Sequence, residues 1–153
     1  MMISSRGALV SACVLLTTMA EAPAGEQKTL EAPCVVDAYL RAHAQTMQAD
    51  AGPASVDAVI KLVDKQVVYE HPGMGIRIET ADSYRQGLEA FLGATDDGHY
   101  EVRDYMVNGN TVSISLDRVF KSQADGDWLE KSISQMMVFE VNDGKIARII
   151  DYW

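Results

Sequence analysis

The feature that most constrains this fold is a pair of β-rich segments near the C-terminus, joined by Asn142-Asp143-Gly144. An Asp-Gly pair between two such segments is the strongest short-range signal of a β-hairpin, because the turn needs positive φ angles that glycine adopts without steric cost. Similar turn signals lie at residues 108–110 and 125–127. The sequence therefore predicts an antiparallel meander of four strands, over residues 99–107, 111–122, 128–141 and 145–152.

Three helical patterns and two short strands precede the meander. Apolar side chains recur every three or four residues over residues 36–47, and Ser55 and Thr80 can cap two further helices. Residues 66–71 and 76–79 have the composition of strands. Because helices come first and a long antiparallel sheet comes last, the sequence predicts an α+β fold with three N-terminal helices on one face of the sheet.

Residues 1–24 have the character of a secretory signal peptide. Arg6 provides a small basic region, an apolar run follows, and Ala22-Pro23-Ala24 fits a cleavage site of small residues. The apolar run is shorter than the roughly 20 residues that a membrane-spanning helix needs. The sequence thus predicts export to the periplasm or the exterior without a stable membrane anchor, then a linker over residues 25–33 and one domain over residues 34–153.

The charge of the chain limits its partners. It has 13 basic and 22 acidic residues and a formal net charge of −9 at pH 7. An acidic chain without a basic run argues against a nucleic acid or an anionic membrane as partner. His43 and His99 have no partners at metal-ligand spacing, so we expect no metal site and no cofactor.

Two local strings and the order of the elements resemble a known superfamily. VVYEHPGMG at residues 67–75 and VFEVNDGKIARIIDYW at residues 138–153 resemble the SnoaL-like branch of the nuclear-transport-factor-like superfamily, also called the cystatin-like cone fold. The resemblance spans about Val35 to Trp153. It implies a curved sheet and helices that enclose an apolar cone. One such cone houses isomerases, dehydratases, cyclases, epoxide hydrolases and non-catalytic binders, so the resemblance leaves the reaction open.

Two enzyme groups of this superfamily indicate site residues. The string around His71 resembles that of ketosteroid isomerases, where an aspartate base stands at this position, and Tyr39 resembles their tyrosine that donates to the enolate oxygen. In limonene epoxide hydrolases a tyrosine and an asparagine two residues apart hold the catalytic water, and these positions resemble Tyr69 and His71. Asp117 and Asp151 fall where those hydrolases have their first and second catalytic aspartates.

One departure counts against epoxide hydrolysis by the same mechanism. The hydrolases have an arginine two residues before the first aspartate, and this chain has Ser115. Two facing carboxylates without an intervening cation would repel, and one would be protonated. Asp117 also has an alternative interpretation as a solvated side chain, because Ile114 and Leu116 alternate with it and lie on the opposite face of the strand.

The register of the last hairpin decides whether Gln135 joins the site. A three-residue turn through residues 142–144 places Gln135 opposite Asp151, at the position that resembles the second oxyanion donor of the isomerases. A two-residue turn would put these two side chains on opposite faces of the sheet. We predict the three-residue turn, because Asn-Asp-Gly suits a type I turn with glycine at the positive-φ position.

The first functional hypothesis is a cofactor-free enzyme that moves protons on an apolar small molecule, by isomerisation, dehydration or water addition. His71 would be the base and Asp151 its partner or a second acid/base group, with Asp117 as a further candidate. Tyr39, Tyr69, Gln135 and Trp153 would bind the substrate, as donors to a developing oxyanion or as pocket wall.

The second hypothesis is a non-catalytic domain on the same cone, which binds a small molecule or a protein. A cone filled by Met74, Met106 and Met137 would favour it, since methionine fills irregular apolar space well. A buried pair of His71 and Asp151 in a closed cavity would favour the enzyme. In either case, relatives with this cone commonly pair through the outward face of the sheet, and we expect a homodimer.

Overall fold

The computed structural model describes residues 31–153, so the predicted signal peptide lies outside the described residues. The first helix begins at Ala32 and takes Pro33 into its first turn, so it overlaps the last two residues of the predicted linker. The elements are α1 (Ala32–Thr46), α2 (Pro53–Ile60), β1 (Val63–His71), η1 (Pro72–Met74), β2 (Ile76–Ile78), α3 (Ala81–Glu89), β3 (Thr95–Asn108), β4 (Thr111–Ala124), β5 (Asp127–Asn142) and β6 (Lys145–Tyr152). No helix among them is long and apolar enough to cross a membrane.

The strands form one six-stranded sheet in the order β2-β1-β6-β5-β4-β3. Strands β3 to β6 are the predicted antiparallel meander. Strand β1, however, pairs with β6 in parallel, so the sheet is mixed and not purely antiparallel as predicted. A parallel pair needs a long connection, and α3 together with the meander provides it.

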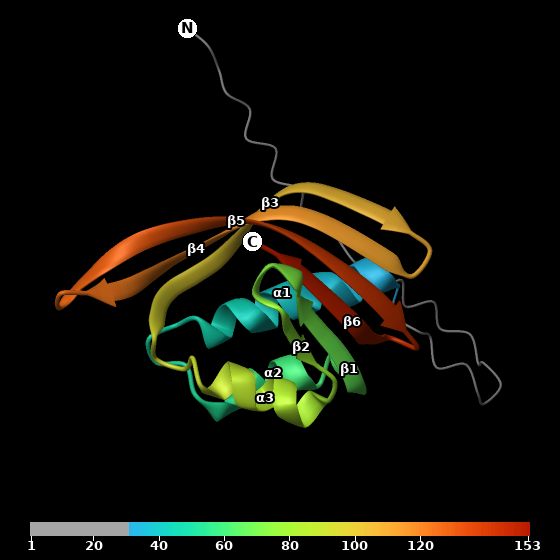
Figure 1. The fold of residues 1–153 in the computed structure, drawn as a ribbon, viewed down its shortest axis with the longest axis horizontal. Coiled ribbons are helices and arrows are strands. Elements are labelled where there is room, and N and C mark those ends of the chain that lie inside the picture. Colours follow the sequence, from blue (N-terminus) through green and yellow to red (C-terminus); the bar gives the residue numbers. More distant parts are fainter. Residues whose placement is uncertain (1–30) are drawn as a thin grey trace, which may run out of the picture.

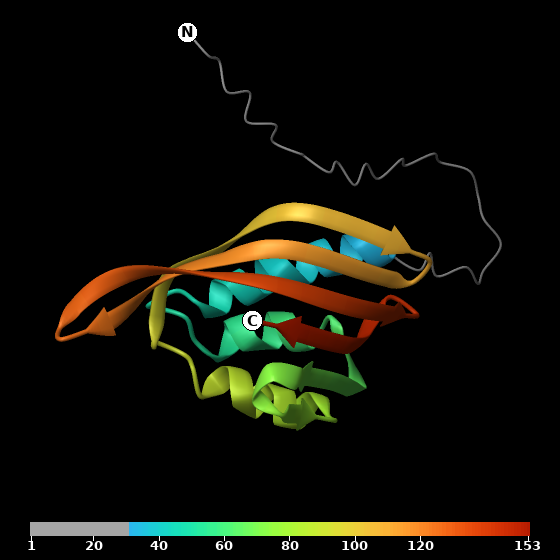
Figure 2. The same ribbon diagram turned by 45° about the horizontal axis from the view of Figure 1, so that its top comes forward.

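The sheet is curved, and the three helices cover its concave face, as predicted for a cone (Figures 1 and 2). Register shifts within the β3–β4 and β5–β6 pairs mark β-bulges, which bend strands. Helix α3 begins as predicted, because the Thr80 hydroxyl accepts a hydrogen bond from the Ser83 backbone N–H. The core lies between α1 and the sheet and includes Val36, Leu40, Ile114, Leu116, Phe139 and Ile149.

The last hairpin has a two-residue turn, so the predicted three-residue turn is wrong. Asn142 pairs with Lys145, and the turn residues Asp143 and Gly144 have φ angles of 49° and 72°. Two positive φ angles are typical of a type I′ turn, whose twist matches that of the flanking strands.

A bulge in β6 cancels the effect of this turn on the register. Glu140 pairs with Arg148 while Val141 pairs with Ile146, so Ala147 is an extra residue on β6. The extra residue reverses the facing of every later position in β6. Asp151 therefore lies opposite Met137, not opposite Gln135 as predicted, but it shares a face with both.

Candidate functional site

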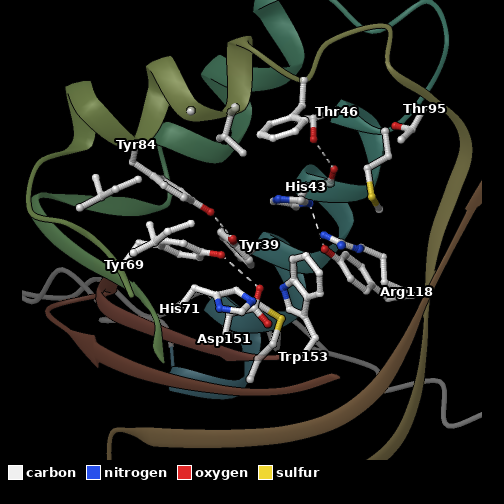
Figure 3. Close-up of a pocket in the computed structure, with 18 of the residues that line it drawn as sticks. Tyr39, His43, Thr46, Tyr69, His71, Tyr84, Thr95, Arg118, Asp151 and Trp153 are labelled. Carbon is white, nitrogen blue, oxygen red and sulfur yellow. Dashed lines mark hydrogen bonds between the residues drawn. The ribbon is translucent and has the colours of Figure 1, made fainter. Parts of the chain in front are cut away.

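A cavity of about 410 Å³ lies between the concave face of the sheet and the helices (Figure 3). This is the size of a pocket for a small molecule. Met74 and Met137 line it, whereas Met106 is 71% exposed to solvent and does not. The three methionines therefore do not fill the cone, and the observation that would have favoured a non-catalytic domain is absent from the described residues.

Asp151 is the buried carboxylate of this cavity and is only 4% exposed. The Tyr69 hydroxyl donates a hydrogen bond to Oδ2 (3.3 Å), and Gln135 Nε2 donates one to Oδ1 (3.1 Å). Burial raises the pKa of Asp151, and the charge of Arg118 and the hydrogen bond from Tyr69 only partly oppose it. A carboxyl group with a raised pKa in an apolar cavity is suited to proton transfer.

Three tyrosines lie together beside Asp151. Tyr69 stacks on Tyr84 with ring centroids 5.4 Å apart, and the Tyr84 and Tyr39 hydroxyls share a hydrogen bond. Desolvation by burial raises the pKa of all three hydroxyls. They therefore remain protonated and act as hydrogen-bond groups, with Tyr69 directed to the carboxylate (Figure 3).

His71 is the last residue of β1 and is 1% exposed. Its Nδ1 accepts a hydrogen bond from the Met74 backbone N–H (3.2 Å), so the ring carries its proton on Nε2. Nε2 is buried and has no hydrogen-bond partner within residues 31–153. The contact opposes the predicted role of His71 as base, since the only lone pair of the neutral ring is already used. His71 presents an N–H donor instead.

Nitrogen-15 NMR of the histidine side chains tests this assignment. We expect His71 to be the Nε2–H tautomer, with the Nδ1 signal in the range of an unprotonated ring nitrogen. His99 is an internal control, because its Nδ1 lies 3.1 Å from the Asp97 carbonyl oxygen, an acceptor, and must carry the proton. An Nδ1–H signal from His71 would restore Nε2 as a possible base.

A second polar group lies across the cavity and includes a residue that the sequence analysis missed. The Arg118 guanidinium carbon lies 5.2 Å from the centroid of the Trp153 ring and 5.4 Å from that of Phe120. His43 Nδ1 and the Tyr100 hydroxyl share a hydrogen bond of 3.0 Å. Burial, followed by the charge of Arg118, lowers the pKa of His43 to about 4, so His43 is neutral at pH 7.

The family match covers most of this arrangement, and Asp151 and Trp153 lie just beyond its last residue. The SnoaL-like domain family matches residues 38–149, from α1 to β6. The chain belongs to the SnoaL-like domain family. Among curated proteins, none matches the chain. Within residues 31–153 of this SnoaL-like chain, no group of three or more His, Cys, Asp or Glu side chains could hold a metal ion.

Solved structures share this SnoaL-like fold. An epoxide hydrolase of the limonene epoxide hydrolase type from M. tuberculosis is 23% identical, with a TM-score of 0.65 over 81% of this chain and 83% of that one. A proposed ketosteroid isomerase from Kribbella flavida is 18% identical, with a TM-score of 0.60 over 80% and 76%. A proposed SnoaL-like polyketide cyclase from Shewanella putrefaciens is 9% identical, with a TM-score of 0.68 over 78% and 77%. At these identities the likeness shows the fold alone.

Asp117, predicted as a catalytic residue, does not line the SnoaL-like cavity. It lies on the opposite face of β4 from Arg118, where Arg103 binds its carboxylate and the Ser134 hydroxyl donates to it (2.7 Å). The hydrogen bond from Arg103 lowers the pKa of Asp117. The alternative interpretation of Asp117, an outward side chain, is therefore the one that this SnoaL-like structure supports.

The other predicted site residues lie at the cavity, but His71 and Asp151 do not form the predicted pair. The lining includes Tyr39, Tyr69, His71, Asp151 and Trp153. Gln135 does not line the cavity but donates a hydrogen bond to Asp151, which does. No hydrogen bond joins His71 to Asp151 among the described residues, although both side chains line one cavity. Arg118 had a signal in the sequence, because it alternates in phase with the inward residues Ile114 and Leu116.

Proposed function

We propose that this SnoaL-like domain is an enzyme that transfers protons on an apolar small molecule, with Asp151 as the acid/base group. The observation that carries the proposal is a carboxylate, 4% exposed, held by Tyr69 and Gln135 at the wall of an apolar cavity. A positioned carboxylate that is poorly solvated is a stronger base than the same group in water.

His71 would assist as a hydrogen-bond donor in this reaction. In an isomerisation Asp151 takes a proton from a carbon next to a carbonyl group and returns it to another carbon. Between the two steps, negative charge develops on the carbonyl oxygen. The buried Nε2–H of His71 has no partner among the described residues and suits that oxygen.

The test uses 5-nitrobenzisoxazole, which reports an apolar base without knowledge of the natural substrate. Removal of its ring C–H proton breaks the N–O bond and releases a coloured cyanophenolate. We expect the protein to accelerate this elimination at least about 100-fold over the same concentration of acetate. A rate equal to that of acetate would contradict the proposal.

Water addition to an epoxide is the second candidate function. It is favoured by the Tyr69–Asp151 hydrogen bond, because Tyr69 and His71 resemble the pair of residues that holds the catalytic water in limonene epoxide hydrolases. Styrene oxide in oxygen-18 water separates the two candidates: labelled diol without elimination activity favours hydration. Inactivity toward both probes favours a non-catalytic binding domain.

We also propose that the domain forms a homodimer through the outward face of the sheet. Met136 and Tyr152 pair across β5 and β6 on this face, together with Val138 and Ile150. Met136 and Tyr152 are 45% and 41% exposed. Burial of this apolar face in a second copy would stabilise the pair. We expect sedimentation of a dimer at micromolar concentration and of a monomer for Val138→Glu; a wild-type monomer would contradict the proposal.

Export of the protein is likewise a proposal. It rests on the basic, apolar and small-residue pattern of residues 1–24, which lie outside the described residues. The mature chain would then begin near Gly25, a short distance before α1.

A further inference from the structure

Arg118 differs from the other arginines that the structure places near carboxylates. Arg77, Arg85, Arg103 and Arg148 each form an ion pair with an Asp or Glu side chain. Arg118 is partly buried, lines the cavity and forms no ion pair within residues 31–153. Its Nε atom is buried and has no hydrogen-bond partner there. A donor of this kind, on a side chain that lines an apolar cavity, calls for an acceptor from a ligand.

The surroundings of Arg118 compensate for only part of its desolvation. The Trp153 and Phe120 rings give cation–π contacts at 5.2 and 5.4 Å, which stabilise the charge but accept no hydrogen bond at Nε. A buried polar group without a hydrogen bond is costly, and a buried charge usually has a counter-charge. The guanidinium plane is suited to a carboxylate, which can accept two parallel hydrogen bonds.

We propose that the ligand of this cavity is an apolar monocarboxylate whose carboxylate group binds Arg118. This inference rests on the proposed function, since it names the substrate class of the same cavity. The apolar body of the ligand lies against the aromatic wall, and its reacting end lies at Asp151 and His71.

The position of Trp153 supports two separate ends for the ligand. Its ring contacts Arg118 on one side and His71 on the other, with centroids of the His71 and Trp153 rings 4.7 Å apart. In Figure 3 the indole lies between the Arg118 side chain and the pair of Asp151 and His71. A molecule that reaches both polar groups must therefore extend along the indole, with an acceptor at each end.

The charges of the lining residues limit the ligand to one negative charge. Arg118 is the only lysine or arginine among the described lining residues, and His43 is neutral. Asp151 lies in the same cavity and would repel added negative charge when ionised. A phosphate monoester, with nearly two charges, would meet one cation and this carboxylate. The carboxylate class fits the arrangement better.

Titration calorimetry with 2-naphthoate and 2-naphthamide tests the proposal. The two probes have the same apolar rings and differ in the polar group, which is a charged carboxylate in one and a neutral amide of similar shape in the other. We expect naphthoate to bind at least about 10-fold more tightly, because a hydrogen bond to a charged group contributes more than one to a neutral group. The preference should fall to within about twofold in Arg118→Gln, with the naphthamide affinity unchanged.

Matched variants make the result specific. Arg103→Gln removes a cation from the outward face and should keep the full preference, and Arg118→Lys should keep a smaller one. If Arg118→Gln does not fold, the Arg118 Nε–H NMR signal, assigned by its absence from Arg118→Lys, should shift with naphthoate and not with naphthamide. Equal binding of the probes, no binding of either, or a preference that survives Arg118→Gln would overturn the proposal.

The binding test is independent of the proton-transfer test. Asp151→Asn keeps Arg118 and should keep the preference for naphthoate even though its elimination activity is lost. A loss of the preference with intact elimination would therefore overturn only the ligand class. Intact binding without elimination would overturn only the proposed reaction.

Discussion

Asp151→Asn is expected to remove nearly all elimination activity toward 5-nitrobenzisoxazole, a loss of about 10²–10⁴-fold. Asparagine has nearly the same shape and still accepts the hydrogen bond from Tyr69, but its amide does not take a proton from carbon. Because burial raises the pKa of Asp151, the wild-type rate should fall as the pH drops through that raised pKa, above the usual value of 3.8.

Asp117→Asn is the matched control for this loss. It changes another carboxylate of the same type, which Arg103 and Ser134 hold on the outward face of the sheet. Its elimination rate should stay within about twofold of the wild-type rate, since the side chain does not line the cavity. Equal losses in the two variants would show that the rate reports general damage to the fold and not the loss of a base.

Asp151→Asn should also stabilise the fold at neutral pH. The folded state raises the pKa of Asp151, so it binds this proton more tightly than the unfolded state does. The contribution of Asp151 to stability therefore falls as the pH rises through the raised pKa, and ionised Asp151 destabilises the fold. Thermal unfolding should show a Tm for Asp151→Asn higher by about 2–6 °C.

The pH dependence separates this effect from a general gain in packing. The difference in Tm should shrink as the pH falls through the raised pKa towards 3.8, where the wild-type carboxyl also becomes neutral. The Gln135 amide can turn so that Oε1, now without a partner among the described residues, accepts from the new amide. A Tm of Asp151→Asn below that of the wild type at neutral pH would contradict the prediction. It would mean that the surrounding groups stabilise the charge of Asp151 by more than burial destabilises it.

The features that local chemistry determines could be predicted from the sequence. The meander follows from three turns with glycine or aspartate at positive φ, and those angles are present at Gly109, Asp125, Gly126, Asp143 and Gly144. The cap at Thr80 follows from its hydroxyl. The resemblance to the cone fold indicated the inward placement of Tyr69 and Asp151, because residues of one parity in a strand share a face.

The features that depend on one extra residue or on a distant partner could not be predicted. Nothing in the sequence around Ala147 distinguishes a regular strand from the bulge that brings Gln135 and Asp151 to one face. The tautomer of His71 depends on the Met74 N–H, which is aimed by the short η1 turn. Arg118 and Asp117 are adjacent in β4, so their side chains lie on opposite faces of the sheet. The resemblance indicated Asp117, which faces outward, and gave no role to Arg118, which lines the cavity.

Gly98→Ala is expected to destabilise the fold by about 2–3 kcal/mol, because the site has no space for a methyl group. A Cβ at residue 98 would lie 2.2 Å from Met47 Cβ and 3.1 Å from the Met47 carbonyl oxygen. The two segments cannot separate freely. The Gly98 N–H donates to the Met47 carbonyl (3.3 Å), and Gln48 Nε2 donates to the Gly98 carbonyl (2.9 Å).

These contacts hold the C-terminal end of α1 against β3, next to the cavity that Met47 and His43 line. Urea unfolding measures the loss of unfolding free energy in Gly98→Ala. Gly87→Ala is the control, and it is expected to have the opposite effect. A methyl group at Gly87 would meet only Ile78 Cδ1 at 3.9 Å, and alanine at this position in the last turn of α3 should stabilise the fold by about 0.5–1 kcal/mol. If Gly98→Ala unfolds at the wild-type urea concentration, α1 and β3 do not approach as closely as the Met47–Gly98 contact requires.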